Sequence, residues 1–137
     1  MRKINRIIIH YSDTYPNMDI GVVEIRRWHT NPNKLGGPYR DIGYHHVIRR
    51  NGQIEIGRPI GQVGAHAGPE GNPGSIGVCV VGGKPIMNFT RAQWRMLDFH
   101  CVMMLQKYGD LEIIGHRDVR QTLCPGFNVR AWWDEKA

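Results

Sequence analysis

The stretch that decides the fold is "INRIIIHYSD", residues 4–13. Three consecutive isoleucines leave it without a polar alternate face, which is typical of a β-strand that is buried on both sides. It ends in polar residues that favour a turn. The segment "IGVCVVGG", residues 76–83, has the same character and predicts a second strand of this kind.

Two helices are expected to accompany these strands. Residues 19–29, "DIGVVEIRRWH", place apolar side chains on one helical side, with Asp19 as the expected N-cap. Residues 91–108 show helical spacing from Trp94 to Tyr108, behind a capping box of Thr90 and Gln93. Gly109 is expected to end this helix.

The remaining segments complete the pattern. Residues 41–59 alternate around Asn51-Gly52, which predicts a hairpin with a two-residue turn. Residues 61–75 hold so much glycine and proline that a long irregular loop is expected, and residues 111–116 predict a last short strand. Strands and helices interleave along the chain, which indicates an α/β fold with helices packed on a sheet.

Length and composition limit the possibilities further. The 137 residues fit one domain, 1–137, and 41% hydrophobic with 22% charged residues is a globular composition. The apolar runs are too short for a membrane span or a signal peptide, and three cysteines are an odd number, so we expect a reducing, cytoplasmic setting. The net charge of +6 favours anionic partners, although scattered basic residues also fit a simply solvated surface.

Three residues that follow predicted strands could bind a metal. His10 ends the first strand, His116 follows the last one, and Cys124 lies in a turn eight residues beyond His116. A catalytic zinc site needs three protein ligands of these types and one open position. From the residues alone, His10 could equally be a hydrogen-bonded histidine at a strand end, and Cys124 a small buried hydrophobe. Cys79 and Cys101 fall on apolar sides and are expected in the core.

Four blocks taken together resemble one family. They are "IIIHYSDT", "DIGYHHVIRRNGQIEIGRP", "GAHAG…N…SIGVCVVGG" and "IIGHRDVRQTLCPG". In order and spacing they resemble the zinc N-acetylmuramoyl-L-alanine amidases, which include phage lysozyme-type enzymes and animal peptidoglycan recognition proteins. The resemblance covers roughly residues 4–130 and implies a single domain with a mixed central sheet flanked by helices.

The resemblance also implies roles for individual residues. His10, His116 and Cys124 match the ligands of one zinc ion, and Tyr44 matches the catalytic tyrosine. His66 matches a residue that lines the cleft near the metal. The implied reaction hydrolyses the amide between N-acetylmuramic acid and the first L-alanine of the peptidoglycan stem peptide.

Two further residues are expected at the substrate, and one catalytic position departs from part of the family. His46 shares a face with Tyr44 if strand alternation extends over both, although the residues favour a packing role for it as the alternative. Asn72 lies in the same block as His66. The phage lysozyme-type enzymes have a lysine two residues before the cysteine ligand, where this chain has Thr122. Catalytic peptidoglycan recognition proteins have threonine there. We therefore expect Thr122 to act as a hydrogen-bond donor.

Three functions fit these observations. The first is a monomeric phage or prophage endolysin that waits in the host cytoplasm until a holin opens the membrane. The second is a peptidoglycan-binding module without activity, although such relatives typically lack the cysteine that this chain has at Cys124. The third is inhibition of a phage RNA polymerase, which one phage lysozyme of the family performs and which the basic charge permits.

Overall fold

A computed structural model of the chain describes residues 1–136. Five strands form one sheet in the order β3-β2-β4-β1-β5. Their bounds are β1 (Arg6–Tyr11), β2 (His46–Ile48), β3 (Ile54–Ile56), β4 (Ser75–Val80) and β5 (Glu112–Gly115). β1 pairs in parallel with β4 and β5, β2 pairs in parallel with β4, and β3 runs antiparallel to β2. The expected mixed central sheet is therefore confirmed.

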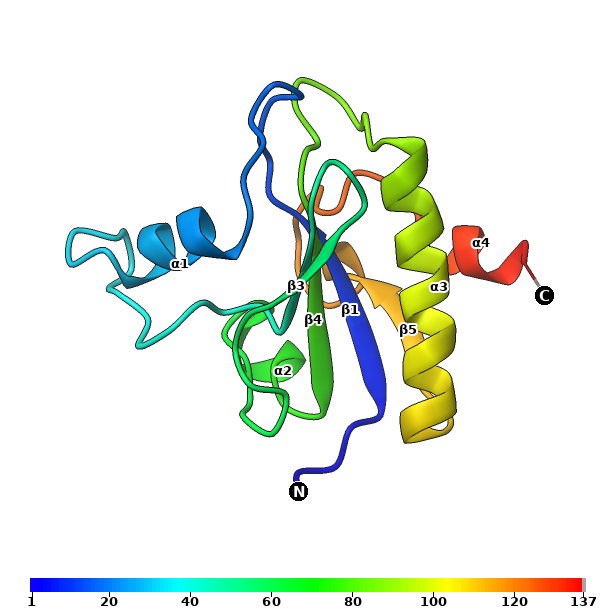
Figure 1. Ribbon diagram of the computed structural model, residues 1–137. Coiled ribbons are helices and arrows are strands. Elements are labelled where there is room, and N and C mark those ends of the chain that lie inside the picture. The colour runs from blue at the N-terminus through cyan, green and yellow to red at the C-terminus, as the bar shows by residue number, and fades with distance from the viewer. Residues whose placement is uncertain (137) are drawn as a thin grey trace.

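The helices lie on both sides of this sheet. They are α1 (Val22–Thr30), α2 (Gly68–Gly71), α3 (Arg91–Tyr108) and α4 (Val129–Asp134), with a short 3₁₀ turn, η1 (His116–Asp118). Figure 1 shows α3 and α4 on one side of the strands, and α1 and α2 on the other. The predicted α/β class is confirmed. Over residues 1–136, no helix combines the length and the apolar character that crossing a bilayer requires.

Alternation along β1 divides the core in two. Ile7 and Ile9 belong to a buried cluster that includes Leu97 of α3. Ile8 points to the opposite side and belongs to a separate, smaller cluster. His10 follows Ile8 by two residues, so its side chain also faces away from α3. The central strand thus contributes to the core on one side and carries a candidate ligand on the other.

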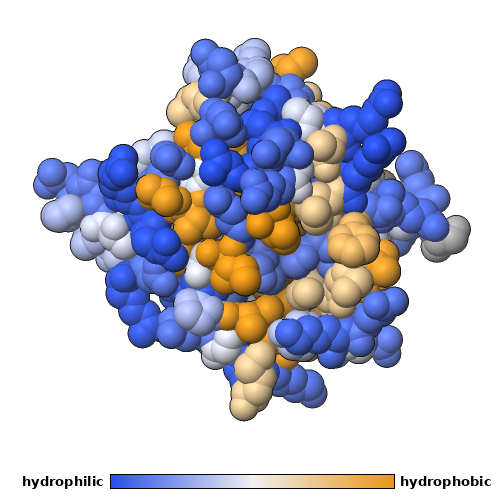
Figure 2. Space-filling view, viewed as in Figure 1, coloured by the Kyte–Doolittle hydropathy of each residue, from blue (hydrophilic) through white to orange (hydrophobic). Residues whose placement is uncertain are grey.

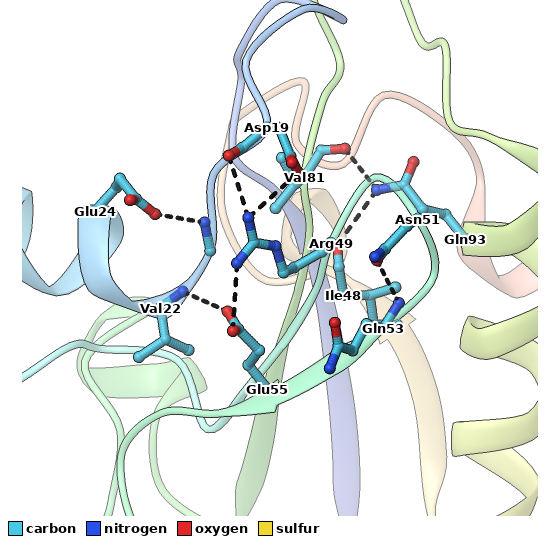
Figure 3. Close-up of polar contacts among 11 residues, drawn as sticks. Asp19, Val22, Glu24, Ile48, Arg49, Asn51, Gln53, Glu55, Val81 and Gln93 are labelled. Atoms are coloured by element: carbon cyan, nitrogen blue, oxygen red, sulfur yellow. Dashed lines mark hydrogen bonds and ion pairs between the residues drawn. The ribbon is translucent and has the colours of Figure 1, made fainter.

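The long helix begins as predicted. Thr90 Oγ1 accepts a hydrogen bond from the Gln93 backbone N–H at 3.1 Å, and Gln93 Oε1 accepts one from the Thr90 N–H at 2.9 Å. The amide of Gln93 also donates to the carbonyls of Ile48 and Val81, at 3.2 and 2.7 Å (Figure 3). One fully buried side chain therefore caps α3 and fastens it to the sheet.

The predicted N-cap of α1 was wrong. Gly21 is the N-cap, and the N–H of Val22 donates to the carboxylate of Glu55 at 2.9 Å. Asp19 instead accepts a hydrogen bond from Arg49 at 3.3 Å, and the same guanidinium reaches Glu55 (Figure 3). A glutamate from β3 occupies the place that a local cap would take, and a Cβ on Gly21 would collide with it.

The two-residue turn predicted at Asn51-Gly52 was also wrong. The backbone N–H of Arg49 donates to the carbonyl of Gln53, so three residues, 50–52, connect the strands. Gly52 has a φ of 87°, whereas Asn51 has no positive φ. A three-residue connection of this kind needs the left-handed conformation only at its last position.

Other departures are small. The expected loop 61–75 contains the single helical turn α2, and α4 was not predicted. Trp132 and Trp133 of α4 pack against the cluster on the α3 side. Figure 2 shows hydrophobic residues in the middle of the displayed face and hydrophilic residues around them.

Candidate metal centre

Three separate elements bring the candidate ligands together. His10 lies near the end of β1 with 1% of its surface exposed, and His116 opens η1 directly after β5. The N–H of Arg117 donates to the Cys124 carbonyl at 2.9 Å, and this hydrogen bond holds Cys124 close to His116. The parallel neighbours β1 and β5 end at the same edge of the sheet, so His10 and Cys124, 114 positions apart in sequence, become adjacent.

The donor atoms are close enough to share one ion. One ligand atom from each of His10, His116 and Cys124 lies within 4.8 Å of the others. His10 Nδ1 is 3.7 Å from Cys124 Sγ. Zinc bonds of about 2.0 Å to nitrogen and 2.3 Å to sulfur in a tetrahedron place donors about 3.3–3.6 Å apart. The cluster therefore needs only a small contraction to fit zinc.

One atom of the cluster has no other partner. His116 Nε2 is buried without a hydrogen bond among the described residues. An unsatisfied buried polar nitrogen is costly, and a metal ion would satisfy it. This orphaned nitrogen, beside an imidazole and a thiol, shows that the residues present fit a zinc ion.

Burial sets the protonation of the ligands. It lowers the pKa of His10 well below 6.5, with smaller contributions from His66 and His116, and it also lowers the pKa of His116. Both imidazoles are therefore neutral at pH 7, as coordination requires. Burial raises the pKa of the Cys124 thiol to about 12, although the N–H of Tyr11 donates to its sulfur. Metal binding would have to displace this proton.

The ring of Tyr44 lies beside the candidate ligand His10. Its ring centroid is 5.0 Å from that of His10 and 5.3 Å from that of His29. Burial, followed by the nearby Cys79 and Cys124 thiols, raises the pKa of Tyr44 well above 10. Its phenol is therefore protonated at neutral pH and can donate a hydrogen bond.

Thr122 sits at the edge of the cluster. Its Oγ1 accepts a hydrogen bond from the backbone N–H of Cys124 at 3.3 Å. A hydroxyl that accepts one bond keeps its own proton for another partner. The geometry is compatible with the expected donor role, which stays a prediction.

His66 and Asn72 border the same region. A cavity of about 340 Å³ beside His116 is lined by Tyr39, Ala65, His66, Gly68, Asn72, His116 and Arg120. Asn72 Oδ1 is already occupied, because it accepts from the backbone N–H groups of His66 and Ala67 at 2.9 and 2.8 Å. The predicted substrate contact of Asn72 would thus fall to its Nδ2. No sequence signal had pointed to Tyr39 or Arg120.

His46 does not lie at the site, so the expected substrate contact was wrong, and its place in the structure is the alternative packing role. Its Nδ1 is 2.9 Å from Nε2 of His100, a residue of α3 on the other side of the sheet. Alternation was counted back from His46 to Tyr44, but β2 begins only at His46. The irregular backbone before the strand lets the two side chains point to opposite sides.

Cys79 and Cys101 are fully buried, as predicted. Cys79 nonetheless borders the candidate site, because it belongs to the buried cluster against which Tyr44 packs. Cys101 belongs to the cluster on the α3 side. The three cysteines thus have different surroundings, and only Cys124 belongs to the metal cluster.

Comparison with known proteins shows which family the chain matches. The chain matches the N-acetylmuramoyl-L-alanine amidase family over residues 1–127. It is 41% identical over 134 residues to the endolysin of Enterobacteria phage T3, covering 94% of this chain and 85% of that protein. The endolysin of Klebsiella phage KP32 is 38% identical over 139 residues, covering 98% and 88%.

Solved structures agree with this. The N-acetylmuramoyl-L-alanine amidase LysC from Clostridium intestinale has a TM-score of 0.80 at 30% identity, covering 97% of this chain and 87% of that one. Drosophila peptidoglycan recognition protein SD, at 21% identity and a TM-score of 0.78, shares the fold. By sequence and by fold, this chain belongs to the N-acetylmuramoyl-L-alanine amidase family.

Proposed function

We propose that the protein is a zinc-dependent N-acetylmuramoyl-L-alanine amidase that cleaves peptidoglycan, acting as a phage or prophage endolysin. The observation that carries this proposal is the cluster of His10, His116 and Cys124, in which His116 Nε2 has no partner within the described chain. The endolysins at 38–41% identity support the biological role. Peptidoglycan is the partner that the family implies.

His10, His116 and Cys124 would hold the metal. Zinc, when bound, supplies Lewis acidity toward the scissile carbonyl and toward water. Three protein ligands leave one position open, as catalytic rather than structural zinc sites do. The presence of Cys124 in the cluster favours catalysis over peptidoglycan binding alone.

The chain's own groups would act on the charge that develops during hydrolysis. Tyr44 keeps its proton because burial raises its pKa, so it can donate to the oxygen of the scissile carbonyl as that oxygen becomes negative. Thr122, with its Oγ1 accepting from Cys124 N–H, would turn its hydroxyl proton toward the substrate. The cavity lined by His66 and His116 would take the substrate next to the metal.

The proposal is tested by incubating the zinc-loaded protein with a muramyl-tripeptide and analysing the products by mass spectrometry. We expect free tripeptide and a product with an intact N-acetylmuramic acid lactyl carboxylate. Metal analysis of the same preparation should find one zinc per chain. A folded, zinc-loaded protein that binds the substrate and releases no peptide would contradict the proposal in favour of a binding module.

A further inference from the structure

A line of hydrogen bonds runs from the metal cluster into the protein. His10 Nε2 is 2.8 Å from His66 Nδ1, and His66 Nε2 is 3.2 Å from Ser75 Oγ. Ser75 Oγ in turn donates to the carbonyl of Gly71 at 2.8 Å. His10 and Ser75 are fully buried, so solvent does not compete for these bonds.

The role of His10 as a metal ligand determines which atom donates and which accepts in each of these hydrogen bonds. His10 turns Nδ1 toward Cys124 Sγ, so Nδ1 is the nitrogen available to a metal, and it must then carry no proton. A neutral imidazole consequently has its proton on Nε2, where it can donate only to His66 Nδ1. His66 then has its own proton on Nε2, and donates to Ser75.

Every group in this arrangement is satisfied. Ser75 accepts from His66, and its hydroxyl donates a hydrogen bond to the Gly71 carbonyl, which is an acceptor only. The backbone carbonyl therefore fixes the far end, and the metal fixes the near end. In the opposite direction, the His10 proton would lie on Nδ1, where it would block the metal.

The surroundings hold the His66 ring in this place. Asn72 Oδ1 accepts from the N–H groups of His66 and Ala67, which fixes the backbone on which the ring is carried. Gly77 of β4 provides the space, because a Cβ there would lie 2.6 Å from His66 Cδ2. Gly64 is equally close to the same atom. A ring so tightly enclosed is poorly suited to follow a moving substrate.

We propose that His66 is a positioning residue of the metal centre: it accepts the Nε2 proton of His10, and so holds His10 in the tautomer whose Nδ1 can bind zinc. This assignment rests on the proposed zinc site and gives His66 a role other than the expected substrate contact. Partners of metal-binding histidines typically change metal affinity by about 10–100-fold when removed.

The test measures the zinc dissociation constant by competition with a chromophoric chelator, with no substrate present. His66→Leu removes the acceptor, and we expect zinc binding to weaken about 10–100-fold. His66→Asn restores an acceptor oxygen near the position of Nδ1, and we expect its affinity to return toward the wild-type value. His100→Leu, which removes a buried histidine from the α3 side, should leave zinc affinity unchanged.

Two further measurements make the outcomes distinct. Thermal unfolding of the metal-free variants identifies any that fail to fold, in which case Ser75→Ala, which keeps both rings, replaces them and should weaken zinc binding by less. Long-range ¹H–¹⁵N spectra of the zinc-loaded wild type should place the His10 proton on Nε2.

Zinc affinity that is equal in wild type and the folded His66→Leu variant would overturn the inference and leave the amidase proposal standing. Equal losses in the Leu and Asn variants would overturn it too, since the acceptor would then not matter. A wild-type protein that binds no zinc would overturn both proposals, whereas a zinc-binding protein without amidase activity would overturn only the function.

Discussion

Two hydrogen-bonded histidine pairs lie on opposite sides of the sheet, and their hydrogen bonds have nearly the same length. His10 and His66 are 2.8 Å apart on the side of α1 and α2, and His46 and His100 are 2.9 Å apart under α3. The first pair adjoins a thiol and an imidazole nitrogen, His116 Nε2, that has no hydrogen bond among the residues that the structure describes. Among residues 1–136, no third metal-binding side chain forms a cluster with the second pair, His46 and His100.

This difference shows that a buried histidine pair is not by itself a site. Burial lowers the pKa of all four residues, so all four are neutral at pH 7. The pairs differ because His10 lies beside His116 Nε2, a buried nitrogen with no hydrogen bond among residues 1–136. Variants on the His10–His66 side should therefore lose bound metal and activity. Variants on the His46–His100 side should lose stability instead.

The largest effect should follow Cys124→Ser. A hydroxyl is a far weaker zinc ligand than a thiolate, so we expect amidase activity to fall below detection and bound zinc to be lost. Peptide release and metal content measure this. Cys101→Ser, which changes a buried cysteine on the α3 side, should lower thermal stability and keep both zinc and activity; if it also lost zinc, the two sides would not be independent.

Tyr44→Phe comes next. It removes one hydrogen-bond donor near the metal, and we expect kcat to fall about 10²–10³-fold while zinc content is unchanged. Tyr108→Phe is the matched control, because the hydroxyl of Tyr108 is buried on the α3 side and has no hydrogen bond within residues 1–136. A loss of activity shared equally by both variants would contradict the role of Tyr44.

The second pair, His46 and His100, should make the free energy of unfolding depend on pH. Burial, with smaller contributions from His100, His45 and Lys107, lowers the pKa of His46 to about 3, and burial lowers the pKa of His100 to about 4. Both stay neutral in the folded protein while the unfolded chain takes up protons below about pH 6.5. The free energy of unfolding should therefore fall as pH drops from 6.5 toward 4.

Each proton bound on unfolding contributes a slope of about 1.4 kcal/mol per pH unit. The double variant His46→Phe/His100→Leu should show a shallower fall in this window than the wild type. Urea unfolding at a series of pH values measures it, with pH 8 as the reference for each protein. Parallel curves for the two proteins would show that this pair does not titrate on unfolding.

The smallest effect should come from the cap of α3. Thr90→Ala removes the acceptor for the Gln93 N–H and should cost about 1 kcal/mol of unfolding free energy, with zinc affinity unchanged. Thr90→Ser keeps the acceptor and should cost less. Denaturant unfolding at pH 7 distinguishes the two.

Local signals predicted much of the fold. The apolar run of β1 and the capping box of α3 each involve only residues that are close together in the sequence. Both elements form as expected. Asp19 failed as a cap because Glu55, more than thirty residues away, supplies the oxygen instead. His46 failed because alternation holds only inside a strand, and the strand begins at that residue.

The candidate site was likewise predicted only in part, and the contacts between distant segments were missed. The resemblance identified His10, His116 and Cys124 as a group, and strand order brings them to one edge of the sheet. The partnership of His10 with His66 had no local signal, since it depends on space left by glycines in other segments. Contacts between distant segments were thus the part that sequence patterns did not contain.

The bond between Arg117 N–H and the Cys124 carbonyl has a kinetic consequence. Two of the three ligands belong to one short segment outside the sheet, whereas His10 lies on a strand with a neighbour on each side. Local opening of residues 116–124 would release two ligands together and leave the third in place. Metal exchange would then follow the opening rate of this segment, and it would need no unfolding of the sheet.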